Sequence, residues 1–266
     1  MKKTLLLALA IAVIPVGVDA QDTPSDSCSY ISIIVPLEDL RTCAEQGFAS
    51  AQYFLGWRYE EGLLGAPQDD AEAVRWYRLA AEQGNVDAQY DLGSAYHNGS
   101  GVPQDVAEAV RWYRLAAAQG NAGGQFILGA MYADGEGVPE DDAEAVRWYR
   151  LAADQGFVPA QFYLGSMYAN GEGVPEDDAE AVRWYRLAAD QGFANAQGAL
   201  GVAYSVGRGV PENDVLAYMW YNLAAAQGND SARGQKDILE EQMTREQIAE
   251  AQRLSTEWLE AHPGGP

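Results

Sequence analysis

Twenty-three consecutive residues, GEGVPEDDAEAVRWYRLAADQGF, stand at positions 135–157 and occur again without a change at 171–193. Looser copies of the same block begin at Gly65, Gly101 and Gly209. An active site is built once, from residues whose roles differ, so such a period predicts a stack of similar structural units. The glycines that close the copies recur every 36 residues, at Gly84, Gly120, Gly156, Gly192 and Gly228.

Each unit contains two helical patterns separated by glycine. In the third unit the first pattern is GGQFILGAMYAD, which ends at Gly135, and the second runs from about Pro139 to Gln155 and ends at Gly156. Proline is tolerated in a first helical turn, and a glycine after the last turn can adopt the left-handed conformation that ends a helix. We therefore expect a helix-turn-helix in every unit.

Several residues recur at the same place in every unit. A glycine inside a helix costs about 1 kcal/mol relative to alanine, so its recurrence indicates a neighbouring helix that passes too close for a side chain. Repeated aromatic residues are typical of packing between helices. One helix pair cannot bury its own apolar face, so the sequence predicts an all-α fold, a right-handed α/α solenoid superhelix of helix-turn-helix repeats. The recurring residues are Leu55, Leu92, Leu128, Leu164 and Leu200; Gly56, Gly93, Gly129, Gly165 and Gly201; Tyr59, Tyr96, Tyr132, Tyr168 and Tyr204; and Trp76, Trp112, Trp148, Trp184 and Trp220.

The stretches AQYFLGWRYEEG, AQYDLGSAYHNG and AQFYLGSMYANG, each followed by a form of GVPxDxAEAVRWYRLAA, resemble the Sel1-like repeat, a relative of the tetratricopeptide repeat. The resemblance implies an adaptor scaffold that binds proteins or peptides on a concave surface. It also implies that an exported bacterial member takes part in envelope signalling, secretion or host contact. We divide residues 48–228 into five repeats of about 48–84, 85–120, 121–156, 157–192 and 193–228.

Some cysteine-rich relatives are described as weak penicillin-binding or β-lactamase proteins. This chain lacks the cysteine pair that those proteins carry in every unit, and it contains neither an S-x-x-K nor a G-x-S-x-G pattern. A serine nucleophile with a lysine partner therefore has no visible basis here.

The N-terminal 47 residues precede the repeats. Two lysines followed by an apolar run at 5–18 and the small residues before Ala20 predict a signal peptide at 1–20, and hence a periplasmic or secreted protein. Residues 21–47 form an N-terminal segment with a half-repeat, LEDLRTCAEQG, as a cap. In an oxidising compartment we expect its two cysteines, Cys28 and Cys43, to form a disulfide.

Residues 229–266 form the C-terminal capping region and tail. Within MTREQIAEAQRLSTEWLEAH, the spacing of Ile248, Leu254 and Trp258 predicts a terminal amphipathic helix. Such a cap at one end and the cysteine pair at the other argue against open ends that stack with further copies, so we expect a monomer.

The net charge of −22 at pH 7 repels phosphate groups, which excludes nucleic acid and anionic membranes as expected partners and favours a basic protein or peptide. No stretch after the first twenty residues is apolar enough to predict a membrane span. We expect no cofactor and no metal centre, because His97 and His262 have no other ligand at metal-binding spacing. Loose cation binding by the acidic loops stays open.

The first helix of each unit has a variable face. Counted from the residue before the repeated glutamine, the third, fourth, seventh and eleventh positions lie opposite the repeated leucine and tyrosine, and these positions vary between units. Large aromatic residues with acidic neighbours on such a face suit a bound peptide, although the third-position aromatics could instead pack against the next repeat. The predicted partner-binding residues are Phe54, Trp57, Glu61, Tyr90, Asp91, Ile127, Tyr163 and Asn170.

Two other functions are weighed against binding. Glu61 and Asp91 could serve as acid and base for glycan cleavage, but nothing in the sequence sets the distance between their carboxyl groups. A self-assembling structural protein is the other alternative. We expect a binding protein with no catalytic residues of its own.

Overall fold

The computed structural model describes Cys28 and residues 34–263, and within this part every regular element is an α-helix. The predicted signal peptide, residues 1–20, lies outside the described residues. Each repeat contributes a first helix, here called the A helix, and a second helix, called the B helix. The A helices are α3 (Ala49–Glu61), α5 (Val86–Asn98), α7 (Ala122–Asp134), α9 (Val158–Asn170) and α11 (Ala194–Val206). The B helices are α4 (Asp70–Glu82), α6 (Val106–Ala118), α8 (Asp142–Asp154), α10 (Asp178–Asp190) and α12 (Asp214–Ala226).

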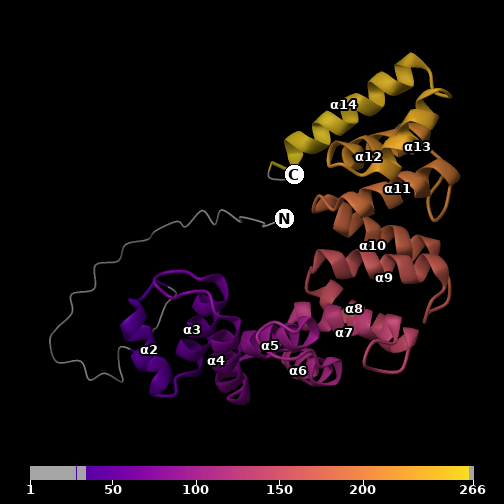
Figure 1. The fold of residues 1–266 in the computed structure, drawn as a ribbon. Helices are drawn as coiled ribbons and strands as arrows, with labels where there is room; N and C mark the ends of the chain where they lie inside the picture. The colour runs from indigo at the N-terminus through magenta and orange to yellow at the C-terminus, as the bar shows by residue number, and fades with distance from the viewer. Residues whose placement is uncertain (1–27, 29–33, 264–266) are drawn as a thin grey trace.

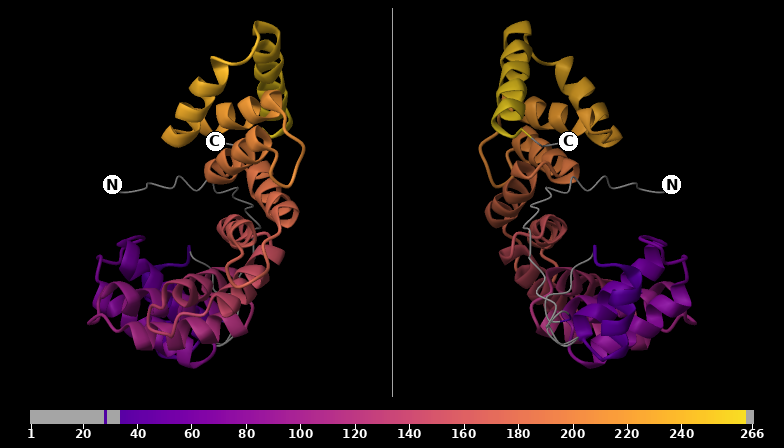
Figure 2. Two further views of the ribbon diagram at one scale, coloured as in Figure 1. Left: turned by 90° about the vertical axis from the view of Figure 1, so that its right-hand side faces the viewer. Right: turned by 90° about the vertical axis from the view of Figure 1, so that its left-hand side faces the viewer.

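The helices pack in chain order. Each A helix packs against its own B helix, and each B helix packs against the A helix of the next repeat. The chain therefore follows a curved path, and Figures 1 and 2 show an arc whose two ends face each other across an open space. The predicted right-handed α/α solenoid is confirmed.

The B helices begin later than predicted. Helix α8 begins at Asp142, not near Pro139, and its N-cap is Asp141, whose carboxylate accepts a hydrogen bond from the backbone N–H of Glu144 at 3.0 Å. An aspartate at the N-cap satisfies an N–H group that has no partner within the helix, which proline cannot do. The proline therefore stays in the loop before the cap. The equivalent caps are Asp69, Asp105, Asp177 and Asn213.

The recurring glycine of the A helix marks the contact with its B helix. A Cβ atom on Gly165 would lie 2.8 Å from Cδ1 of Tyr185, the tyrosine that follows Trp184. The four equivalent glycines meet the equivalent tyrosines at 2.4 to 2.9 Å. The prediction that a neighbouring helix passes too close for a side chain is therefore confirmed.

A buried glutamine ties each A helix to the helix before it. Gln125 in α7 donates a hydrogen bond to the carbonyl of Ala117 at 3.1 Å and accepts one from Gln155 at 2.7 Å. The equivalent bonds recur through all five repeats. Arginines of the B helices add a second tie, since Arg114 donates to the hydroxyl of Tyr132 in the next A helix at 3.0 Å. The repeats are thus joined by polar contacts as well as by apolar packing.

Three further helices cover the ends of the array. At the N-terminus α2 (Leu37–Glu45) packs against α3, and Cys28 is joined to Cys43 by the predicted disulfide, with Cα atoms 5.5 Å apart. At the C-terminus α13 (Asp230–Glu240) and α14 (Arg245–Ala261) pack against α12, and the rings of Trp258 and Trp220 lie 6.1 Å apart. None of the described helices is long and apolar enough to cross a membrane.

Candidate binding surface on the A helices

A row of slots follows the variable face of the A helices. Each slot is bounded by the third-position side chain of one repeat and by the tyrosine that follows tryptophan in the B helix of the same repeat. The fourth-position residue of the next repeat enters the slot. From first to fourth, the bounding pairs are Tyr53 and Tyr77, Tyr90 and Tyr113, Phe126 and Tyr149, and Phe162 and Tyr185.

The four bounding pairs have nearly the same spacing, and their interplanar angles are 32°, 55°, 38° and 37° in chain order. Their ring centroids lie 5.8, 5.8, 5.7 and 5.7 Å apart in chain order. The interior glycine allows this arrangement, because the tyrosine ring of the B helix lies across it and reaches the A-helix face. The repeated scaffold therefore places a similar pair of rings beside each of the four slots, and we call this pair the frame of the slot.

The residue that enters the slot differs each time. It is Asp91 in the first slot, Ile127 in the second, Tyr163 in the third and Ala199 in the fourth. The ring of Tyr163 stacks on Tyr149 at 5.7 Å and stays 45% exposed. A surface that selects its ligand needs different side chains at equivalent positions, and the four slots provide them.

The first slot is acidic. The phenol of Tyr53 hydrogen-bonds Asp91, and the phenol of Tyr77 donates to the carboxylate of Glu60 at 2.5 Å. Burial, followed by the charge of Glu60, raises the pKa of Asp91 to about 7 against the opposing effect of Tyr53. Burial also raises the pKa of Glu60. Two carboxyl groups are thus held in a place that disfavours their charged forms.

Replacing Asp91 with asparagine should stabilise the protein at alkaline pH. The pKa of Asp91 is higher in the folded chain than the value of about 3.9 in an unfolded one. Its contribution to stability is therefore fully present below pH 4 and is lost as the pH rises through 7. We expect Asp91→Asn to gain about 1 to 2 kcal/mol at pH 8 and almost nothing at pH 4, measured by denaturant unfolding. Asp190→Asn, which removes an exposed carboxylate of α10 two repeats away, is the control, and equal gains at both pH values would contradict the assignment.

Three of the predicted partner-binding residues enter slots, and a fourth bounds one. Asp91, Ile127 and Tyr163 enter the first three, and Tyr90 bounds the second. The third-position aromatics also pack between repeats, since the ring of Phe126 lies 5.4 Å from that of Phe157. The alternative interpretation of this position therefore holds, and Tyr90 is part of the frame.

The other predicted residues lie beside the row. Phe54 and Trp57 are half-buried against the core of the first repeat. Glu61 and Asn170 are exposed, but each lines a pocket next to a slot, Glu61 with Tyr77 and Asn170 with Tyr185. For the alternative acid–base pair of Glu61 and Asp91, the structure points to the preceding residue, because Glu60 is the glutamate whose charge raises the pKa of Asp91. One position along a helix turns a side chain by about 100°, which decides which glutamate faces the slot.

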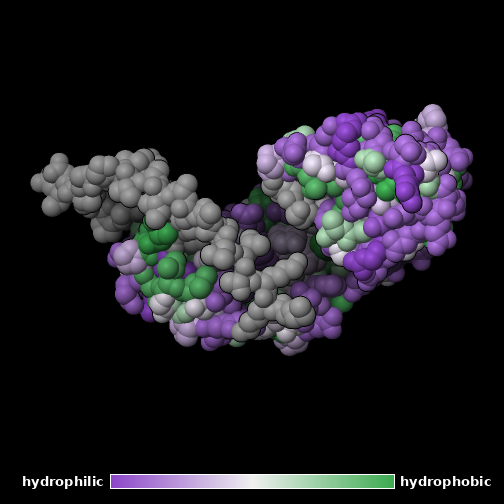
Figure 3. All heavy atoms as spheres, turned by 90° about the horizontal axis from the view of Figure 1, so that it is seen from above, coloured by the Kyte–Doolittle hydropathy of each residue, from purple (hydrophilic) through white to green (hydrophobic). Residues whose placement is uncertain are grey.

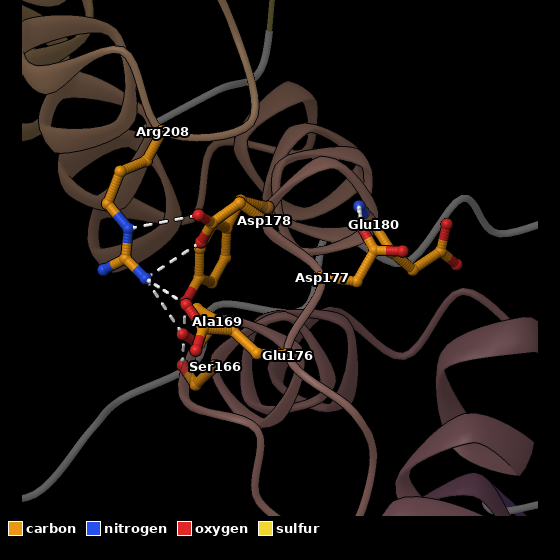
Figure 4. Close-up of polar contacts among 8 residues, drawn as sticks. Ser166, Ala169, Glu176, Asp177, Asp178, Glu180 and Arg208 are labelled. Atoms are coloured by element: carbon orange, nitrogen blue, oxygen red, sulfur yellow. Dashed lines mark hydrogen bonds and ion pairs between the residues drawn. The ribbon is translucent and has the colours of Figure 1, made fainter.

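A charged cluster, with Arg208 at its centre, closes the fourth slot on one side. Arg208 extends from the loop between α11 and α12 and pairs with Asp178 at 3.0 Å and Glu176 at 3.2 Å. It also donates to the carbonyl of Ala169 at 3.1 Å (Figure 4). Sequence analysis missed this residue, because the equivalent loop positions carry Ser100, Glu136 and Glu172 and give no common pattern.

The two ends of the molecule differ in the hydropathy of the surface that is seen from above (Figure 3). Seen from above in Figure 3, the C-terminal helices are largely hydrophilic, hydrophobic atoms gather over the N-terminal helices, and the molecule is hollowed between its two ends. Among the described residues, no group of three or more His, Cys, Asp or Glu side chains is placed to hold a metal ion.

The helix pairs, their interior glycines and their 36-residue spacing match a known family. The family model described as Sel1 repeat matches residues 49–85, 86–121, 122–157, 158–193 and 194–229. The chain belongs to the Sel1 repeat family. Sel1 repeats mediate protein interactions, and proteins built from them are typically non-enzymatic scaffolds.

Two solved structures of Sel1 repeat proteins are similar to the whole array. A protective antigen from uropathogenic Escherichia coli strains is 39% identical with a TM-score of 0.76, over 85% of this chain and 49% of that one. This chain therefore spans about half the length of the E. coli structure. A Sel1 repeat protein from Oxalobacter formigenes is 34% identical with a TM-score of 0.70, over 84% of this chain and 88% of that one. The comparison with curated proteins gave no match.

Proposed function

We propose that this Sel1 repeat protein is an adaptor or scaffold that binds a basic segment of a partner protein along the row of slots. One observation carries the proposal: the side chains that bound the slots are similar, whereas the residue that enters each slot differs. The centroid distances of the bounding ring pairs repeat almost unchanged, whereas the fourth position changes from acid to aliphatic, aromatic and small side chains. Packing alone would favour one residue at all four places.

The acidic slot would anchor the basic segment. The charge of Glu60 raises the pKa of the half-buried Asp91, and the carboxylate of Glu60, whose residue is exposed, stays within reach of a ligand from solvent. A lysine or arginine side chain placed between them would replace this repulsion with attraction and lower their pKa values. The net charge of −22 would steer a basic segment towards the surface.

We also propose that the protein works outside the cytoplasm, in the periplasm or beyond the cell. The disulfide between Cys28 and Cys43 supports this location, because disulfides form and persist in oxidising compartments. The sequence pattern of residues 1–20 supports it independently.

Selection from a random peptide library tests the proposal. We expect the wild-type protein to enrich peptides rich in lysine and arginine, and the double variant Glu60→Gln/Asp91→Asn to bind these peptides at least tenfold more weakly. Affinity should rise between pH 6 and pH 8, because the ionised form of Asp91, whose pKa is about 7, is the form that attracts a cation. Isothermal titration calorimetry at the two pH values measures both effects.

The matched control removes the same two charges elsewhere. Glu82→Gln/Asp154→Asn neutralises exposed carboxylates near the ends of α4 and α8. If this control weakens binding as much as the slot variant does, the selected peptides respond to net charge alone and the slot is not their site. Failure to enrich any basic peptide would overturn the proposal itself.

A further inference from the structure

The fourth slot is bounded by a pair of rings like that of the third slot, but the residue that enters it is not aromatic. In the third slot the centroids of Phe126 and Tyr149 are 5.7 Å apart at an interplanar angle of 38°. In the fourth, those of Phe162 and Tyr185 are 5.7 Å apart at 37°. The two frames can therefore hold the same kind of side chain.

The occupant of the third slot is an aromatic ring of the protein itself. Tyr163 stacks on Tyr149 at an angle of 22°, and its centroid lies 5.6 Å from that of Phe126 and 5.5 Å from that of Phe162. The equivalent residue in the fourth slot is Ala199. A single methyl group stands where the previous repeat places a phenol.

Space remains on both sides of Ala199. One pocket of about 220 Å³ is lined by Tyr185, Ala199 and Val202, and another of about 260 Å³ is lined by Phe162, Gly198, Ala199 and Val202 among others. Cavities of about 150 Å³ in other proteins accept a benzene ring. Each pocket is therefore large enough for one aromatic side chain.

Packing of the solenoid does not require the small residues here. A Cβ on Gly198 would meet no atom closer than 3.6 Å, whereas a Cβ on the interior Gly165 would lie 2.8 Å from a tyrosine ring. In the preceding repeat the two positions of Gly198 and Ala199 carry Phe162 and Tyr163. The preceding repeat thus carries large aromatic residues at both places, and no close contact at the Cβ position of Gly198 requires a glycine there.

We propose that the fourth slot binds one aromatic side chain of the partner segment, in the place that Tyr163 occupies one repeat earlier. The proposal rests on the proposed function, since the same basic segment would supply the ring. Phe162 lines one of the two pockets and Tyr185 the other, so a ring that enters the slot would gain aromatic contacts in addition to apolar burial. A segment with an aromatic residue on the C-terminal side of the array and a basic residue at the first slot would use both ends of the row.

The first test uses p-cresol, the side chain of tyrosine as a free molecule, with the full chain. We expect saturable shifts of the methyl resonances of Ala199 and Val202 in the wild type, and loss of the Val202 shift in Ala199→Tyr, which carries no methyl group at position 199. That variant restores the sequence pattern of the preceding repeat, so its circular dichroism melt should match the wild type. In Tyr163→Ala, which empties the third slot, a shift should also appear at the methyl group that the substitution introduces. No shift at Ala199 and Val202 would overturn the proposal.

The second test asks whether the partner segment uses the slot. Peptides selected for basic character should bind Ala199→Tyr at least tenfold more weakly than the wild type, and Ala199→Ser should bind them as the wild type does. Unchanged affinity in Ala199→Tyr would overturn this inference while leaving the proposed function standing. Loss of peptide binding in Glu60→Gln/Asp91→Asn tests the proposed function separately.

Discussion

Replacing Gly173 with alanine is expected to destabilise the solenoid by about 4 kcal/mol or more. Gly173 lies in the loop between α9 and α10 with φ at +67°, a conformation that costs an ordinary residue about 1 to 2 kcal/mol. A Cβ there would also lie 2.3 Å from the carbonyl oxygen of Asp142, at the start of α8 in the preceding repeat. The added methyl group would clash with backbone atoms, which cannot rotate away as a side chain can. The clash can therefore be relieved only if the two repeats move apart. Thermal and denaturant unfolding followed by circular dichroism measures the loss.

Two other glycines of the same array separate the sources of this loss. Gly156 has φ at +85° but no atom within 4 Å of its Cβ position, so Gly156→Ala should cost only about 1 to 2 kcal/mol. At Gly137 the Cβ would meet the side chain of Val106 at 2.6 Å, with the nearest backbone atom at 3.3 Å, so Gly137→Ala should fall between the two. Equal losses in Gly156→Ala and Gly173→Ala would show that backbone conformation alone decides the effect.

The sequence predicts the architecture well because each repeat obeys local rules. A left-handed glycine after each helix, such as Gly135 with φ at +67°, and the interior glycine opposite a tyrosine are set by contacts within one unit or between neighbouring units. The same rules repeat five times in the chain, so internal comparison shows which positions they fix. The start of the B helix was predicted too early because an aspartate cap outweighs a nearby proline, and Asp141 precedes α8.

The candidate site was predicted only in part, because its slots are assembled from three helices. The fourth-position residues were found by their variability, and Asp91 and Tyr163 do enter slots. The tyrosines of the B helix were assigned to packing, yet Tyr77 also binds Glu60 on the A-helix face. The glycine that faces each of these tyrosines was the available signal, since a ring that lies across a helix can reach its far side.

Long-range charge pairs were beyond the reach of a repeat comparison. Arg208 contacts Asp178 and Glu176, which are 30 and 32 residues earlier in the chain, and only one repeat carries arginine at its position. A residue that occurs once has no internal counterpart against which its role can be inferred. For the same reason Ala199 is informative only once the geometry of the preceding slot is known.

Replacing the buried Gln125 with glutamate should destabilise the protein by about 3 kcal/mol at pH 8. The change keeps the shape of the side chain but turns a donor into an oxygen that faces the carbonyl of Ala117, where the amide nitrogen now lies at 3.1 Å. A carboxyl group buried there should have a pKa above its unfolded value of about 4.3, so the penalty should be absent below pH 4 and grow as the pH rises. Denaturant unfolding at several pH values measures this profile.

Gln155→Glu adds the same charge to the chain at the residue that donates the other hydrogen bond, the one that Gln125 accepts. Gln155 is exposed, and it donates to the oxygen of Gln125 at 2.7 Å, so its replacement can turn towards water at a cost of about 1 kcal/mol. A large, pH-dependent loss in Gln125→Glu beside a small one in Gln155→Glu would assign the stabilising role to the buried donor. If the two variants lose the same free energy of unfolding at every pH, added charge alone accounts for the effect. The hydrogen bonds of Gln125 and its equivalents would then not be what joins the repeats.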